Sequence, residues 1–291
     1  MTLDINALAN GIAATAVDQT KAKSGGGGDY TPPAEGLALL RLVGYVETGK
    51  IFKKGNPGKR IPDKNVDQAW LVFELHGPKY PVKDNEDGTK TPVRMTVKMN
   101  TNYAGLSEKA GIFKLFRRMN YDGTATHFSQ LLGKAYIANV RHNKWMKTVD
   151  GKEVEQINAT FEDAERNLTI RPPKREVYDE DTGETSIKDV KVPEAISQLR
   201  LFVWNAPENM IGDLWNCLYI AKTGDGEYDP NVFQNAIKKS LSFEGSPVAQ
   251  YLKANGQVAD IPDAKKADDL GLDDDDGLSG KQDSDDPLAG M

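Results

Sequence analysis

Cations and aromatic rings recur together through the first half of the chain. Residues 41–147 contain twenty Lys and Arg against nine Asp and Glu, a net charge of +11, whereas the whole chain carries −6. Lys and Arg neutralise phosphates, and flat rings stack unpaired bases at about 1–3 kcal/mol per base, with little preference for base type. The combination therefore favours a surface that binds single-stranded nucleic acid.

Sixteen residues of this basic segment are candidate contacts for such a ligand. They fall on the first three predicted strands, in a long polar loop over residues 50–66, and around the end of a fourth strand over residues 134–145. The set is Arg41, Tyr45, Phe52, Lys53, Lys54, Lys59, Arg60, Trp70, Arg94, Lys98, Tyr136, Arg141, His142, Lys144, Trp145 and Lys147.

Core packing is the competing interpretation for every aromatic residue in the set. Arg41 and Tyr45 are predicted to share one strand face, yet Tyr45 and Trp70 could equally be covered by the C-terminal half of the chain. Phe73 is expected in the core. Trp145, between lysines near a hairpin tip, is expected at the surface.

The C-terminal segment has the opposite charge. Residues 260–291 contain eleven acids against three cations and no aromatic residue, so the segment is predicted to be disordered. Acids followed by small apolar residues predict a ligand for a partner's basic pocket, and this partner-binding tip comprises Asp285, Asp286, Pro287, Leu288 and Met291. The tail is also expected to compete with nucleic acid for the basic segment.

The hydrophobic pattern predicts strands over residues 37–49, 68–76, 92–99, 134–145 and 154–161. A helix capped by Ser107 is expected after the third strand, with a short helical piece over residues 127–132 before the fourth. Three strands, a helix and two strands predict a mainly β fold with minor α, a five-stranded Greek-key barrel of the oligonucleotide-binding type. Another small barrel or an α+β sandwich stays compatible with this order.

Four regions follow from composition. Residues 1–36 are predicted to be a flexible leader with a glycine linker, residues 37–163 the barrel, residues 164–259 an extension packed on or beside it, and residues 260–291 the acidic tail. Within the extension, residues 164–200 are expected to be irregular apart from an acidic hairpin signal at residues 179–184. A strand near residues 199–204 and helices after Asp229-Pro230 and Ser246-Pro247 are also expected.

Enzymatic chemistry is not predicted, and neither is a cofactor or a metal. Residues 44–50 have the glycine and lysine spacing of a phosphate loop, but Ile51 stands where a Mg²⁺-binding hydroxyl is required. The single Cys217 and three histidines argue against a zinc site. One cysteine and the absence of a long apolar run predict a cytoplasmic protein with no membrane partner.

Several segments resemble a family of tailed-bacteriophage single-stranded DNA-binding proteins. They are residues 39–48, 69–75, 107–111, 131–134, 140–143 and 241–247, and the resemblance spans roughly residues 37–255. It implies an oligonucleotide-binding barrel that acts in phage DNA replication or recombination in the host cytoplasm, with phage or host replication and recombination proteins as partners of the tail. This tail departs from the aromatic-ended version, because it finishes in Leu288 and Met291.

Other functions stay open from sequence alone. A DNA-annealing recombinase or another nucleic-acid enzyme would share the basic segment, and a virion or scaffold protein could carry it as a solvated face. A homodimer is also left open.

Overall fold

The computed structural model describes residues 31–55, 60, 62–85, 88–102, 107–149, 152–221 and 229–256. The chain divides after Pro32, and the helices and strands of the described residues all lie in the second part. The glycine linker and the whole acidic tail, with its predicted partner-binding tip, lie outside the described residues. Among the described residues, no helix is long and apolar enough to cross a bilayer.

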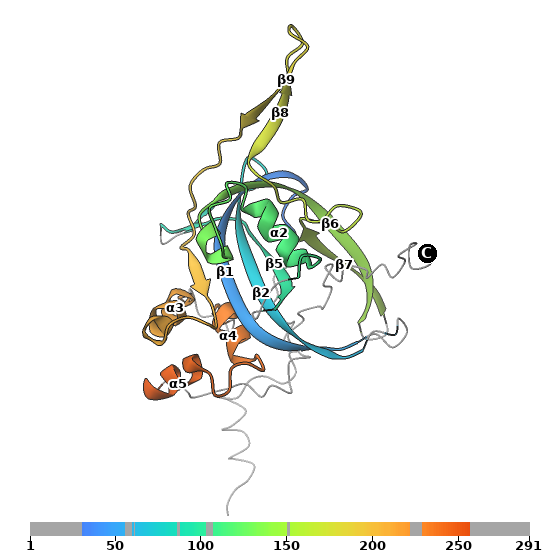
Figure 1. Cartoon of the computed structure of the whole chain (residues 1–291). Helices are drawn as coiled ribbons and strands as arrows, with labels where there is room; N and C mark the ends of the chain where they lie inside the picture. Colours follow the sequence, from blue (N-terminus) through green and yellow to red (C-terminus); the bar gives the residue numbers. More distant parts are fainter. Residues whose placement is uncertain are drawn as a thin grey trace, which may run out of the picture. The chain divides into compact units, whose positions relative to one another are not determined.

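One antiparallel sheet organises the fold (Figure 1). Its strands are β1 (Gly36–Lys53), β2 (Lys64–His76), β5 (Arg94–Thr101), β6 (Ala135–Val149) and β7 (Lys152–Thr160). They lie in the order β5-β2-β1-β6-β7, and β10 (Arg200–Phe202) pairs in parallel with β1. The predicted mainly β class and all five predicted strands are therefore confirmed.

The sheet is not a closed barrel, which corrects the predicted Greek-key closure. β5 and β7 are the two ends of the hydrogen-bonded order. β6 pairs with β1 only over Ala135 to Val140 and then continues with β7 as a two-stranded ribbon. Because that ribbon runs beyond β1, its backbone groups pair with each other rather than completing a ladder to β5.

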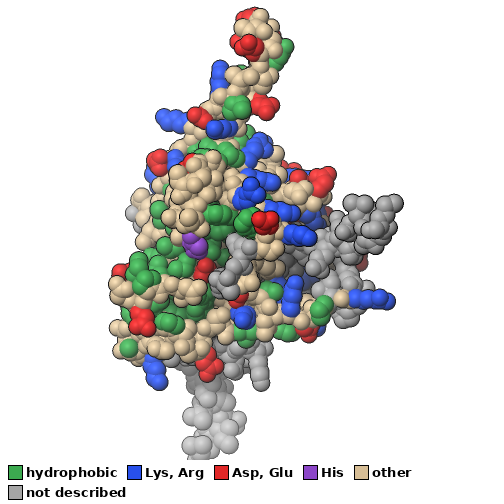
Figure 2. Space-filling model, viewed as in Figure 1, with side chains coloured by type: hydrophobic (Ala, Val, Ile, Leu, Met, Phe, Trp, Pro, Cys, Tyr) green, Lys and Arg blue, Asp and Glu red, His purple; other side chains and the backbone are tan. Residues whose placement is uncertain are grey.

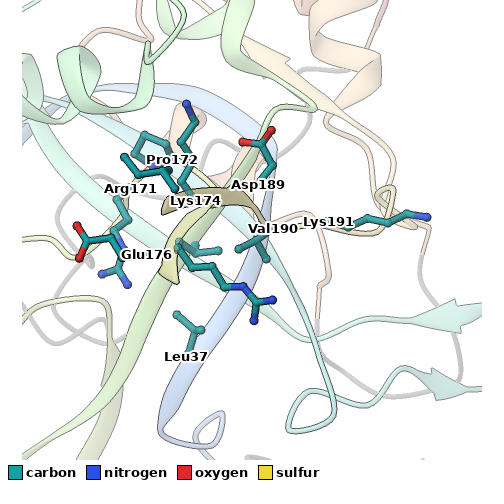
Figure 3. Close-up of a pocket in the computed structure, with 11 residues that line it drawn as sticks. Leu37, Arg171, Pro172, Lys174, Glu176, Asp189, Val190 and Lys191 are labelled. Carbon is teal, nitrogen blue, oxygen red and sulfur yellow. The ribbon is translucent and has the colours of Figure 1, made fainter. Parts of the chain in front are cut away.

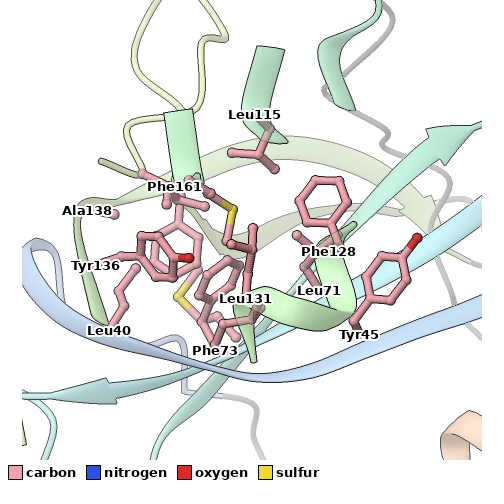
Figure 4. Packing of buried hydrophobic residues seen from close by; sticks show 14 of the residues in the cluster. Leu40, Tyr45, Leu71, Phe73, Leu115, Phe128, Leu131, Tyr136, Ala138 and Phe161 are labelled. Carbon is pink, nitrogen blue, oxygen red and sulfur yellow. The ribbon is translucent and has the colours of Figure 1, made fainter. Parts of the chain in front are cut away.

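Both faces of β2 are buried. Leu71, Phe73 and Leu75 point into a first core beneath α2 (Gly111–Met119) and the 3-10 turn η2 (Phe128–Leu131), as Figure 4 shows for part of the cluster. Trp70 and Val72 point into a second core. Strands buried on both faces read as continuous apolar runs. The face of β2 that the sequence pattern predicts to be polar is therefore buried against the second core.

The second core is formed with the C-terminal extension. Its helices are α3 (Ile211–Cys217), α4 (Val232–Lys238) and α5 (Pro247–Ala254), preceded by a short 3-10 turn, η3 (Glu208–Met210). Ser246 caps α5 by accepting a hydrogen bond from Ala249 N at 3.2 Å, and Pro247 occupies the first turn, both as predicted. The strand near residues 199–204 is confirmed as β10, and residues of α3, α4 and α5 pack with β1 and β2 in the second core.

A β-bulge in β1 changes which side chains share a face. The pairing of β1 with β2 shifts register between Leu42 and Gly44. Leu40 and Leu42 face the first core, Val43 faces the second, and after the bulge Tyr45 again faces the first. The prediction that Arg41 and Tyr45 share a face is therefore wrong, since one extra residue reverses the alternation.

The helix after β5 starts later than predicted. α2 begins at Gly111 with Ala110 as its N-cap, while Ser107 accepts a hydrogen bond from Lys109 N at 3.3 Å in the preceding turn. Its apolar face is as predicted, with Ile112, Leu115 and Met119 buried.

Two small hairpins form two-stranded sheets separate from the main sheet. One joins β3 (Lys83–Asp84) to β4 (Lys90–Thr91), and the other joins β8 (Lys174–Tyr178) to β9 (Thr185–Asp189). The acidic hairpin signal at residues 179–184 is the tip of the second, but its strands fall where irregular structure is predicted. Every residue of β9 is exposed, so no buried alternation marks it.

Candidate nucleic-acid interface

The structure buries three of the five aromatic candidates, Tyr45, Trp70 and Tyr136. Tyr45 is 3% exposed, and its ring stacks on Phe128 of η2 at 5.4 Å between centroids. Tyr136 is fully buried against Phe73, and burial raises the pKa of its hydroxyl. Neither ring is available for a base, which corrects two predictions.

Trp70 is covered from the other side. It is 8% exposed and meets Phe233 of α4 edge to face at 5.9 Å between centroids. Its indole Nε1 donates to Gln68 Oε1 at 2.7 Å, and Lys98 Nζ lies 4.9 Å from the ring centroid. The C-terminal extension therefore occupies the face on which a base was predicted to stack.

Arg41 is bound by its own chain. Its guanidinium donates to three carbonyl oxygens, those of Pro193 at 2.7 Å and of Gly133 and Val192 at 2.8 Å. It also lies 2.9 Å from Glu194 Oε1. A guanidinium has five N–H donors, so little capacity remains for a phosphate. The prediction that Arg41 contacts nucleic acid is corrected to a structural role.

Two buried carboxylates hold the same extension. Glu74 accepts hydrogen bonds from the backbone N–H groups of Ile196 at 2.8 Å and Ser197 at 2.7 Å. Glu47 accepts from Trp204 N at 2.9 Å. Charged groups on β1 and β2 therefore fasten residues 192–204 across the sheet, and sequence reasoning assigned no such role to either glutamate.

The β6–β7 ribbon carries the candidates that stay accessible. Alternation along β6 places Arg141, Asn143, Trp145 and Lys147 on one face, and the register places Gln156 and Asn158 across from them. Arg141 is exposed, while Trp145 and Lys147 are partly exposed. This row of cations, amides and one ring is named the ribbon face.

His142 and Lys144 lie on the opposite side of the same ribbon, so the predicted cluster divides between two faces. His142 Nε2 is 2.8 Å from Pro33 O, and its backbone N donates to Glu35 Oε1 at 2.7 Å. Lys144 is exposed and lies 3.6 Å from Glu155 Oε2. His142 is therefore a structural residue, and Lys144 keeps a solvated, weakly paired charge.

The far end of β1 is a second exposed element. Phe52 is 58% exposed, Lys54 and Arg60 are exposed, and Lys53 is partly buried. Lys59 lies outside the described residues. In the view of Figure 1, the far ends of β1–β2 and β6–β7 point toward the same side.

β5 carries two of the candidate cations. Arg94 is exposed, and Lys98 is partly buried over the ring of Trp70. Of these two cations, Arg94 is the more accessible to a ligand.

Sequence reasoning missed a basic groove on α2. Glu108, Phe113, Lys114, Arg117 and Arg118 line a hollow of about 460 Å³. Figure 2 shows Lys and Arg side chains gathered over α2. Arg118 donates to the carbonyl of Leu168, which fixes its position. The spacing of residues 114, 117 and 118 places three cations on one helix face, and that spacing was the available signal.

Within the described ranges, no cluster of three His, Cys, Asp or Glu side chains could hold a metal ion. Burial raises the pKa of Cys217, whose thiol donates to Leu201 O at 3.1 Å. Comparison of the chain with protein-family models, curated proteins and solved structures found no match.

Proposed function

We propose that this protein binds single-stranded DNA with little sequence preference and has no enzymatic activity. The observation that carries the proposal is the ribbon face, where a partly exposed Trp145 lies between Asn143 and Lys147 on one side of a strand. An accessible ring flanked by a cation and an amide offers base stacking and phosphate neutralisation in neighbouring positions. That combination is nonspecific, because every base has a flat face.

The strand order supports an oligonucleotide-binding barrel that is open along one side. Numbered by chain order within the sheet, the strands lie 3-2-1-4-5, with a helix between the third and fourth. β5 and β7 contact each other without forming a ladder. Barrels of this type bind oligonucleotides with the loops between strands 1 and 2 and between strands 4 and 5. Those positions correspond to the Phe52 end and the ribbon face.

The groove on α2 extends the proposed path for the phosphates. It contributes three cations and the ring of Phe113, and only one carboxylate, that of Glu108. Neutralising several phosphates makes affinity strongly dependent on salt. A role in phage DNA replication or recombination, with partners recruited by residues 260–291, remains part of the proposal.

Titration with oligo(dT) tests the proposal, with tryptophan fluorescence as the readout. Trp70 and Trp215 are buried, and Trp204 packs against the second core, so Trp145 is the tryptophan placed to be quenched by a base. We expect salt-dependent quenching in the wild type. Trp145→Phe should lose the quenching yet keep affinity within a few-fold, measured by anisotropy of a labelled strand.

The alternatives give different results in the same preparation. Cleavage of labelled DNA in the presence of Mg²⁺ would support a nuclease, and accelerated pairing of complementary strands would support an annealing recombinase. A protein that neither quenches nor changes anisotropy at low salt does not bind single strands, and the proposal is then wrong.

Removal of residues 260–291 tests the role proposed for the tail. Residues 260–291 carry a net charge of −8, whereas the basic segment, residues 41–147, carries one of +11. If it competes with DNA, its removal should tighten oligo(dT) binding, most at low salt. Unchanged affinity would reject the competition while leaving DNA binding itself intact.

A further inference from the structure

The hairpin formed by β8 and β9, named the arm, exposes large apolar side chains on one face. Tyr178 is 63% exposed and Ile187 is 69% exposed. Tyr178 pairs with Thr185 and Glu176 pairs with Ile187, so the two apolar side chains lie on the same face of the ribbon. An isolated two-stranded ribbon is only marginally stable in water, and an apolar stripe along it marks a surface for docking.

The two ends of the arm carry opposite charges. Its tip, residues 179–184, contains Asp179, Glu180, Asp181 and Glu184 and no cation. Its base borders a groove of about 720 Å³ lined by Arg171, Lys174, Arg175 and Lys191, with Glu176 and Asp189 as the acidic members. The tip carries a formal charge of −4 and the groove one of +2.

The groove is a fixed feature of the sheet. Ile137 of β6 and Arg171 exchange backbone hydrogen bonds of 3.0 and 2.9 Å, which anchor the base of the arm. Leu37 of β1, 52% exposed, contributes apolar lining beside Ile187. Figure 3 shows the charged side chains around this hollow. A ligand that fits would therefore present acids together with an apolar surface.

The arm cannot place its own tip in its own groove. The paired strands hold the tip away from the cations of the groove, because Lys174 and Arg175 lie five and four residues before it, about 17 and 14 Å at ~3.4 Å per residue. An acidic tip that lies over this groove would therefore belong to another molecule. A surface that carries both halves of a complementary pair fits a twofold contact, in which each copy presents the same patch to the other.

We propose that two copies of this chain associate through their arms, laid antiparallel. The acidic tip of each copy lies over the basic groove of the other, and the stripes of Tyr178 and Ile187 face each other between the two charged contacts. A ribbon of this length buries less than the ~1,000 Å² typical of stable complexes, so the dimer should be weak and weakened further by salt. The association requires no nucleic acid, so it stands independently of the proposed function.

Sedimentation velocity of the full chain over a range of concentrations at low salt tests the contact. Glu180→Lys/Asp181→Lys/Glu184→Lys changes the formal charge of the tip from −4 to +2, and Lys174→Glu/Arg175→Glu changes that of the groove from +2 to −2. Each variant alone should associate at least about tenfold more weakly than the wild type. An equimolar mixture of the two should recover dimers, because both contacts of the mixed pair are again complementary.

The mixture also guards against misfolding, since two damaged variants would not restore each other. Glu165→Lys/Glu208→Lys/Glu244→Lys is the matched control for the tip variant, because it changes three exposed acids outside the arm and so has the same net charge. It should associate like the wild type. A monomeric wild type, or reversed variants that do not recover on mixing, would overturn the proposal.

Nucleic acid is the other polyanion that the groove could meet. If the groove reversal abolishes oligo(dT) binding but leaves sedimentation unchanged, the groove binds DNA and the arm contact is rejected. If the wild type dimerises but binds no oligo(dT), the arm contact stands and the proposed function fails.

Discussion

Two candidate tryptophans, each with a lysine nearby, have opposite surroundings in the structure. Trp70 lies on β2 beside Lys98 of β5, and Trp145 lies on β6 between Lys144 and Lys147. The first is 8% exposed beneath α4, whereas the second is partly exposed on the ribbon face. A ring among cations therefore indicates a ligand surface only where no other part of the chain covers it.

The difference arises from what pairs with each strand. β1 beyond Leu42 gains β10 as a parallel neighbour, and the helices that follow β10 pack on Trp70 and Val72. Among the strands that the structure describes, β6 beyond Val140 pairs with β7 alone. The covering layer comes from residues more than 120 positions after Trp70, a contact that local pattern does not encode.

The largest expected effect is on stability. It concerns the covered face, which is the side of β1 and β2 on which the C-terminal extension packs. Glu74→Ala removes a fully buried carboxylate that accepts hydrogen bonds from the part-buried N–H groups of Ile196 and Ser197, so it should lower the free energy of unfolding by about 2–5 kcal/mol. Oligo(dT) affinity of the folded protein should not change. Urea unfolding and anisotropy on the same preparation measure both quantities.

Glu194→Ala is the control for that variant. Glu194 is 88% exposed where it pairs with Arg41, so its loss should change stability by less than about 1 kcal/mol. A Glu74→Ala protein that unfolds like the wild type but loses DNA affinity would show that the covered face binds DNA.

The second effect concerns the ribbon face itself. Trp145→Ala should weaken oligo(dT) binding by about 5- to 150-fold, the equivalent of ~1–3 kcal/mol of base stacking. Tyr178→Ala removes an exposed ring from the arm and should leave affinity unchanged. Equal losses of oligo(dT) affinity in the two variants would mean that an exposed aromatic side chain contributes to binding wherever it lies on the surface.

A pH effect should belong to the covered face alone. Burial lowers the pKa of His76 from 6.5, nearby Glu74 raises it, and Arg41 lowers it further. The unfolded chain therefore binds a proton more readily than the folded protein. The contribution of neutral His76 to the free energy of unfolding is therefore complete above pH 6.5. It is lost as pH falls below that value, because the unfolded chain then takes up a proton first.

The slope from this one group is at most about 1.4 kcal/mol per pH unit. Urea unfolding at pH 7.5 and pH 5.5 should show a smaller loss of stability in His76→Gln than in the wild type. An identical loss in both proteins would assign the pH dependence to other groups.

The sequence predicted what depends on neighbouring residues. Alternation located the five strands of the main sheet, helical spacing located the buried face of α2, and Ser246-Pro247 located the start of α5. Partial exposure of Trp145 followed from the lysines beside it near a hairpin tip. These features depend on periods of two or 3.6 residues and on capping chemistry.

The features that the sequence did not predict depend on strand register and on contacts between residues far apart in the chain. The bulge at Leu42/Gly44 moves Tyr45 into the first core, and although an isolated glycine such as Gly44 often marks a bulge, alternation alone does not give the resulting change of face. Arg41 has the composition of a phosphate ligand, yet carbonyls about 150 residues later occupy its guanidinium. The arm strands carry no buried alternation, so the pattern that predicts strands is absent there.

The smallest effect is the sharpest comparison of the two regions, because it separates two cations of equal formal charge. Each phosphate contact to a single strand contributes about 0.7 to the slope of log affinity against log salt. Lys147→Ala should reduce the slope by roughly that amount, while Arg41→Ala should leave it unchanged despite lowering stability. The slope, unlike affinity at one salt concentration, is insensitive to the fraction of unfolded protein if that fraction stays constant across the series. A reduced slope in Arg41→Ala with an unchanged slope in Lys147→Ala would place the phosphates over the C-terminal extension and reverse the assignment of the two faces.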